Sequence, residues 1–174
     1  MKRVELLVQD KLYNQYIQKN IDLVKDQLIF QHDFQHHLDV ARIAYILILE
    51  DAALNIFIKE CNLSGKLAAK EVIYASGLLH DIGKWKEYSE NIDHAIFGAD
   101  FAREILARVF FTANEIDIIS HAVFEHNNIN IDMSFLGERI YRADNFARVH
   151  IHHRMHRTGP KIIPNELSVS SFEY

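Results

Sequence analysis

The segment GLLHDIGK, residues 77–84, places a histidine and an aspartate directly after an apolar run. This pair, His80 and Asp81, offers an imidazole and a carboxylate, which are ligands that zinc, manganese and iron accept. The preceding LAAKEVIYASGLL is apolar nearly all the way round a helix, as expected of a buried central helix. Because buried polar groups need partners, the pair indicates a functional site. The other His-Asp pair, His32 and Asp33, precedes a helical pattern and predicts a helix start instead.

Four further helical segments each place one imidazole or carboxylate within an apolar stripe, if a helix advances about 100° per residue. His36, for example, shares its face with Val40 and Ile43. His37 falls at the flank of the same helix, and His121 lies on a polar face. One inward histidine is ordinarily a hydrogen-bonded core residue. Six inward groups from five helices are different, because an inward carboxylate is costly without a cation, and together they predict a metal site. The six are His36, His80, Asp81, His94, His126 and Asp144.

Few residues that break helices interrupt the chain, which has six glycines and two prolines, both in the last fifteen residues. This composition favours an all-α fold. Thr112 and Glu115 have the spacing of a capping box and predict a helix start. KWKEYSENID, residues 84–93, is expected to form a loop and NNINIDMS a turn. Apolar periodicity predicts helices over residues 8–29 (one or two helices), 33–59, 66–82, 94–109, 113–126 and 134–157.

Length and composition narrow the class of protein. A chain of 174 residues is long enough for one core and predicts a single domain over 1–174, with an irregular tail at 158–174. The net charge of −5 gives no case for duplex nucleic acid or an anionic membrane as the main partner. A single cysteine, Cys61, suits a reducing cytoplasm, and neither a membrane span nor a signal peptide is evident. The expectation is a cytoplasmic protein, and a homo-oligomer is left open.

The order His36, His80-Asp81, His94, His126, Asp144 resembles that of the HD-domain metal-dependent phosphohydrolase superfamily. Three motifs carry the resemblance, namely HHLDVARIA, GLLHDIGK and YRADNFAR, within a motif core of about residues 30–157. The resemblance implies an HD-domain helical bundle with a metal site in its core. His36, His80, Asp81 and Asp144 would hold one metal. Asp81 would bridge to a second metal held by His94 and His126. No Gly-Tyr-Pro triplet follows His126, which disfavours cyclic dinucleotides as substrates.

The function that this resemblance implies is hydrolysis of a nucleotide or other small phosphate ester through a metal-activated water. The cofactors would be two divalent ions, chosen from Mn, Fe, Co, Ni, Mg and Zn. Asp81 and Lys84 would be catalytic, and Lys84 and Arg148 would bind the substrate phosphate, since each stands one turn past a ligand.

Simpler interpretations stay open at this stage. Lys84 can be a solvated lysine at a helix end, and Arg148 can be paired with Asp144. RVHIHHRMHR, residues 148–157, is either a polar surface or a basic rim that attracts an anionic substrate. Two other functions use the same ligands: a di-iron oxygenase of the same fold, and a non-catalytic module that binds a nucleotide or a partner.

Overall fold

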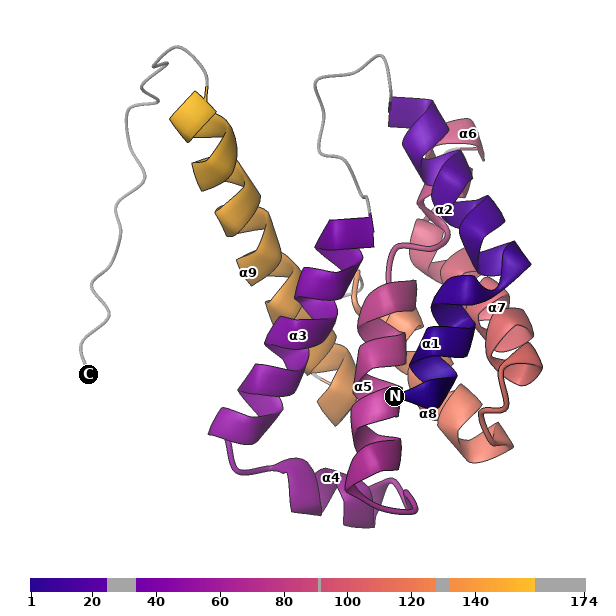
Figure 1. Ribbon diagram of the computed structural model, residues 1–174, viewed down its shortest axis with the longest axis vertical. Coiled ribbons are helices and arrows are strands. Elements are labelled where there is room, and N and C mark those ends of the chain that lie inside the picture. The colour runs from indigo at the N-terminus through magenta and orange to yellow at the C-terminus, as the bar shows by residue number, and fades with distance from the viewer. Residues whose placement is uncertain (25–33, 91, 128–131, 159–174) are drawn as a thin grey trace.

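The computed structural model describes residues 1–24, 34–90, 92–127 and 132–158. These residues fold into a bundle of α-helices, with no strand among them (Figure 1). The predicted all-α class is therefore confirmed. In chain order the helices are α1 (Lys2–Gln9), α2 (Lys11–Val24), α3 (Phe34–Glu50), α4 (Leu54–Glu60), α5 (Lys66–Leu79), α6 (Lys84–Glu90), α7 (His94–Arg108), α8 (Ala113–Glu125) and α9 (Phe135–Thr158).

Most of the predicted helices are confirmed, and α8 shows the local cause most clearly. Thr112 accepts a hydrogen bond from the backbone N–H of Glu115, while the Glu115 carboxylate accepts one from the N–H of Thr112. This reciprocal cap satisfies two donors that the first turn leaves unpaired. The proposed helix start at Asp33 and residues 128–131 of the NNINIDMS turn lie outside the described residues.

Three predicted boundaries are wrong. The first helical segment was expected to begin at residue 8, but α1 already spans Lys2–Gln9 and α2 begins at Lys11. The periodic segment 33–59 does not form one helix, because Ala52 adopts a left-handed backbone with φ 52° and α4 starts anew at Leu54. The expected loop 84–93 contains α6, a helix of seven residues without an apolar stripe. Tertiary contacts stabilise α6, since the backbone N–H of Trp85 donates to Asn20 Oδ1 on α2 at 2.7 Å.

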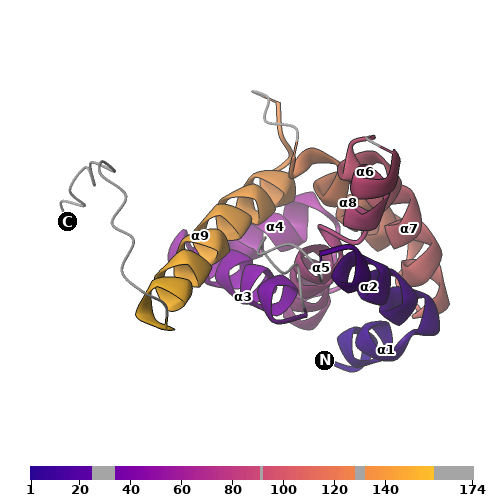
Figure 2. The same cartoon turned by 90° about the horizontal axis from the view of Figure 1, so that it is seen from above.

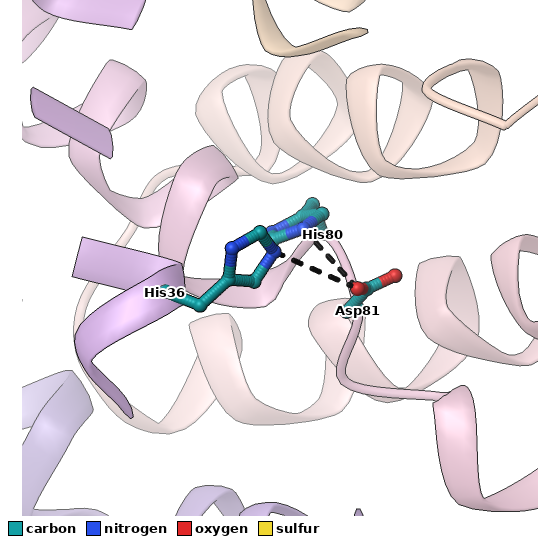
Figure 3. Close-up of side chains that lie close together, drawn as sticks. All are labelled: His36, His80 and Asp81. Carbon is teal, nitrogen blue, oxygen red and sulfur yellow. Dashed lines mark ion pairs between the residues drawn. The ribbon is translucent and has the colours of Figure 1, made fainter. Parts of the chain in front are cut away.

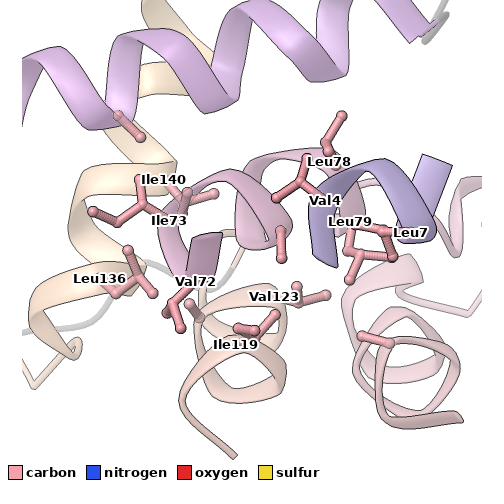
Figure 4. Packing of buried hydrophobic residues seen from close by; sticks show 14 of the residues in the cluster. Val4, Leu7, Val72, Ile73, Leu78, Leu79, Ile119, Val123, Leu136 and Ile140 are labelled. Atoms are coloured by element: carbon pink, nitrogen blue, oxygen red, sulfur yellow. The ribbon is translucent and has the colours of Figure 1, made fainter. Parts of the chain in front are cut away.

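Helix α5 lies at the centre of the bundle, as its uniformly apolar sequence predicted. Helices α3 and α9 lie on one side of it and α7 and α8 on the other (Figures 1 and 2). Val72, Ile73, Leu78 and Leu79 on α5 are all completely buried in the core (Figure 4). Fully burying an aliphatic side chain of this size contributes about 1.5–3 kcal/mol, so α5 anchors both sides of the bundle.

The first helix is held to the bundle by a charged cluster. The Arg3 guanidinium donates to Glu71 on α5 at 2.6 Å and to Glu115 on α8 at 2.6 and 3.0 Å. Both carboxylates are nearly buried, at 4% exposure, and the bidentate geometry to Glu115 is the strong form of this contact. Arg3 therefore links α1 to the central helix and to the helix that carries the capping box.

Within the described ranges, no helix combines the length and the apolar character that crossing a membrane requires.

Candidate metal centre

The structure brings all six inward groups together at one end of α5. His80 and Asp81 directly follow α5, His36 lies on α3, and Asp144 lies on α9. His94 is the first residue of α7 and His126 immediately follows α8. None of these six residues is more than 3% exposed. Each expected inward direction is thus confirmed, and His121, at 60% side-chain exposure, faces outward as expected.

One group of ligand atoms forms on the side of α3 and α9. His36 Nε2 lies 3.2 Å from Asp144 Oδ1 and 4.0 Å from Asp81 Oδ2. His80 Nε2 lies 3.3 Å from the same Asp81 oxygen and 3.7 Å from Asp144 Oδ1. Figure 3 shows His36 and His80 both directed at Asp81. His36, His80 and Asp81 form a set whose ligand atoms lie within 4.8 Å of one another, so they could hold a metal ion.

A second group forms on the side of α7 and α8. His94 Nε2 lies 2.9 Å and His126 Nε2 lies 3.4 Å from Asp81 Oδ1, and the two nitrogens lie 3.1 Å apart. Asp81, His94 and His126 form another set that could hold a metal ion. The two oxygens of Asp81 are therefore divided, with Oδ2 facing the first group and Oδ1 the second.

The outer nitrogens of three rings are already engaged. His80 Nδ1 lies 2.7 Å from the carbonyl oxygen of Gly77, and His126 Nδ1 lies 2.6 Å from that of Val123. His94 Nδ1 lies 2.6 Å from Glu87 Oε2. Since a carbonyl oxygen only accepts hydrogen bonds, Nδ1 carries the proton in His80 and His126, and Glu87 is the acceptor nearest to Nδ1 of His94. Nε2 is then the nitrogen left to bind a cation, which is the arrangement typical of metal-binding histidines.

The charges in the first group favour a cation at its centre. Burial lowers the pKa of His80, but Asp81 and Asp144 overcome this effect and raise it to about 10. Burial would raise the pKa of Asp144, yet its hydrogen bonds to His36 and His80 lower it well below the usual range. The Asp144 carboxylate thus stays charged, and the two carboxylates together draw a proton onto His80. A divalent ion could replace that proton and balance the same negative charge.

Two glycines let the helices come close enough to form the groups. A Cβ added at Gly77 would lie 2.5 Å from the Cα of Ala41 on α3, which is shorter than real Cβ contacts. A Cβ added at Gly83 would lie 2.4 Å from the carbonyl oxygen of His94 and 2.8 Å from the nitrogen of Gly98. Gly77 therefore brings α3 against α5, and Gly83 brings α7 against the segment that carries Asp81.

The two expected phosphate-binding cations lie beside the groups, and both have carboxylate partners. Lys84 Nζ lies 2.7 Å from Glu87 Oε2 and 3.3 Å from His94 Nδ1. Arg148 donates through Nε to Asp144 Oδ1 at 3.0 Å, and its Nη2 lies 2.5 Å from Oδ2. The simpler interpretation of Arg148, a salt bridge along α9, thus describes its contact in this structure. The side chains of residues 149–158 in the histidine-rich segment lie outside the described part of the chain.

Sequence reasoning was wrong about His37 and missed two residues. His37 is fully buried, its Nδ1 lies 2.8 Å from the carbonyl oxygen of Leu78, and burial lowers its pKa to about 3. Asn20 on α2 is 2% exposed and donates to the carbonyl oxygen of Asp81 at 2.9 Å. Glu87 on α6 contacts both Lys84 and His94. Only the presence of a polar residue, Asn20, on the apolar face of α2 beside Tyr13 and Ile17 could have drawn attention to it.

Comparison with the sequences of known proteins identifies the family of this chain. A family model described as HD domain matches residues 33–149. An uncharacterized protein of Clostridium beijerinckii is 31% identical over 150 residues, which cover 86% of this chain and 85% of that protein. Ribonuclease Y of Pelobacter propionicus is 31% identical over 114 residues, covering 66% of this chain. A bifunctional uridylyltransferase/uridylyl-removing enzyme of Novosphingobium aromaticivorans is 34% identical over 62 residues, covering 36%.

The extent of these similarities differs. The chain spans most of the Clostridium protein, but only 18% of the length of ribonuclease Y and 6% of that of the bifunctional enzyme. No solved structure matches the chain significantly.

Proposed function

Because the chain belongs to the HD domain family, we propose that it is a metal-dependent phosphohydrolase acting on a nucleotide or another small phosphate ester. HD domains bind divalent metals, and the core contains two groups of residues that could hold them. One observation carries the proposal. Asp81 directs one oxygen toward His80 and His36 and the other toward His94 and His126, as a carboxylate shared by two ions would.

The proposed ligands divide between two ions. The first set is His36, His80, Asp81 and Asp144; the second is Asp81, His94 and His126. Imidazole nitrogens combined with carboxylate oxygens suit manganese, iron, cobalt, nickel or zinc better than a site made of oxygens alone would. Bound divalent ions would lower the pKa of a water molecule and would neutralise negative charge on a phosphate ester.

In this proposal the chain's own cations bind the substrate. Lys84 lies beside the second group, and Arg148 pairs with Asp144 of the first, so a phosphate placed between them would have a cation on each side. Both side chains already have carboxylate partners, which hold them close to the site before a substrate arrives. Asp81 contributes by joining the two groups, and Lys84 by stabilising negative charge on the phosphate.

The family and the names of two relatives support the proposed substrate class. Ribonuclease Y and the uridylyl-removing enzyme both carry names that refer to reactions of RNA or of a uridylyl group. A phosphate ester of a nucleotide is the chemistry that these names share. A single domain over residues 1–174 and a cytoplasmic location remain predictions from the sequence.

The proposal is tested by metal analysis of protein purified without a histidine tag, followed by assays on metal-free protein. Mn²⁺, Co²⁺, Ni²⁺, Fe²⁺, Mg²⁺ and Zn²⁺ would each be added to a panel of nucleotides and general phosphatase substrates. We expect phosphate release that requires the ion and is lost in His80→Ala. His121→Ala is the control, because its side chain is exposed.

Two results would refute the proposal. Oxygen consumption by an iron-loaded protein that hydrolyses none of the substrates would favour the oxygenase function instead. Metal binding that stabilises the protein without any turnover of substrate would favour the non-catalytic module.

A further inference from the structure

Glu87 connects the second group to the lysine beside it. It lies on α6, the helix that the sequence did not predict. Its Oε2 lies 2.6 Å from His94 Nδ1 and 2.7 Å from Lys84 Nζ, while the side chain as a whole is 36% exposed. One carboxylate oxygen therefore contacts both a proposed metal ligand and a proposed substrate-binding cation.

The distances around His94 Nδ1 show which carboxylate lies nearest to this nitrogen. Glu87 Oε2 lies 2.6 Å from His94 Nδ1 as an ion-pair contact, so this carboxylate is the acceptor nearest to a proton on Nδ1. The Lys84 ammonium lies 2.7 Å from the same Glu87 oxygen and 3.3 Å from His94 Nδ1, and when Nδ1 carries the proton Lys84 pairs with Glu87 alone. The other nearby carboxylate, Asp93, lies 3.6 Å from His94 Nδ1 and already accepts the backbone N–H of Ala95. Glu87 is thus the nearer acceptor for this ring.

Glu87 also differs in kind from the partners of the other rings. His80 and His126 direct Nδ1 at backbone carbonyl oxygens within their own helical turns. A carboxylate carries a full charge, so it orients a ring more strongly and raises the basicity of the opposite nitrogen. Among these three histidines, His94 is the one whose outer partner is a side chain, and that partner can be changed without touching the helix backbone.

We propose that Glu87 is a positioning residue that fixes His94 with Nε2 directed at Asp81 and His126, and that it tunes the second metal group without affecting the first. This inference rests on the proposed metal-dependent function. It predicts a selective effect, because no contact joins Glu87 to the histidines of the first group among the described residues. Losing an outer partner of this kind typically weakens metal binding by about 10–100-fold.

The test compares Glu87→Ala, Glu87→Gln and Glu90→Ala by calorimetric titration of metal-free protein with Mn²⁺. We expect Glu87→Ala to weaken the second equivalent by about 10–100-fold and to leave the first unchanged. Glu87→Gln should fall between, because its amide oxygen still accepts the Nδ1 proton but carries no charge. Glu90→Ala is the matched control, since Glu90 lies on the same helix and pairs with Lys86 at the surface. A second equivalent of unchanged affinity in Glu87→Ala would overturn the inference.

A second measurement separates this inference from the proposed function. In metal-free wild-type protein, the Nδ1 proton of His94 should give a downfield NMR signal that exchanges slowly with water, assigned by its absence in His94→Gln. We expect the signal to persist in Glu87→Gln and Glu90→Ala and to be lost in Glu87→Ala. If wild type binds only one Mn²⁺, the two-ion function fails while this signal still reports on Glu87. A signal that persists in Glu87→Ala would refute the positioning role whatever the metal content.

Discussion

Replacing Gly77 by alanine should separate α3 from α5 at the level of the first metal group. The added Cβ would lie 2.5 Å from the Cα and 2.6 Å from the nitrogen of Ala41, whereas ordinary contacts begin at 3.4 Å. The shortfall of 0.9 Å, the difference between 3.4 and 2.5 Å, is against backbone atoms. No side-chain rotation can relieve it, so one helix must move.

The energetic effect can be worked from two opposing contributions. Forcing an extra methyl into a packed interior costs about 1–3 kcal/mol, and a clash with backbone belongs at the upper end. Alanine in a helix is better than glycine by about 1 kcal/mol, which leaves a net loss of about 2 kcal/mol. For a chain of this size each kcal/mol lowers Tm by about 2–4 °C, so Tm should fall by about 4–8 °C.

The same movement should weaken metal binding in the first group. Ala41 lies on the helix that carries His36, and Gly77 lies three residues before His80. Metal–ligand distances tolerate only about 0.2 Å, so a shift several times larger should lower Mn²⁺ affinity there by about tenfold or more. The measurements are thermal unfolding of metal-free protein and calorimetric titration with Mn²⁺.

Gly83→Ala is the matched variant for the second metal group, on the side of α7. Its Cβ would meet the backbone of His94 and Gly98, so the second group rather than the first should lose affinity. Gly77→Ala protein with the Tm and both Mn²⁺ affinities of wild type would show that the close approach of α3 and α5 does not define the site.

Removal of ligands should distinguish the two groups. Asp81→Asn should lose both ions, since its oxygens face both groups, and metal analysis showing full occupancy would contradict the shared role. His94→Ala and His126→Ala should each retain about one ion per chain while hydrolysis falls steeply; wild type that never exceeds one equivalent would rule out the second ion. Because the pKa of His80 is raised to about 10, the metal-free protein should be stabilised fully below pH 6.5 and lose this contribution as the pH rises through about 10, seen as a falling Tm. Mn²⁺ binding near neutral pH should release about one proton from His80, measurable with an indicator in weak buffer, and no release would show that this ring is already neutral.

The sequence predicted the residues of the site because four helices carry strong amphipathic patterns. His36, His94 and Asp144 are polar residues whose neighbours on the same helix face are mostly apolar, and each is buried. His37 was wrongly assigned to the flank because helical spacing describes only one helix at a time. Its burial results from the contact between α3 and α5, where the carbonyl oxygen of Leu78 serves as its partner.

The parts that sequence reasoning missed depend on contacts between distant segments. Helix α6 is short and polar, and its first turn is fixed by Asn20, which lies 65 residues before Trp85. Trp85 also stacks beside Tyr16 and Phe101, with ring centroids 5.9 Å apart in each case. No periodicity within residues 84–90 could reveal these partners. Glu87 was missed for the same reason, since its role exists only once α6 is a helix that packs near the start of α7.

The position of Asp81 relates the architecture to the proposed chemistry. Asp81 follows the last turn of α5, and its oxygens contact His36 on α3 and the histidines at α7 and α8, so it stands between the two sides of the bundle. Its backbone is held independently of the ligands, because its carbonyl oxygen accepts from Asn20 Nδ2 and from the N–H of Lys84. The carboxylate can therefore serve both groups without depending on either for its position. Since α3 approaches α5 at Gly77 and α7 approaches the segment after α5 at Gly83, changes on one side should alter one metal group while the shared carboxylate keeps the other in place.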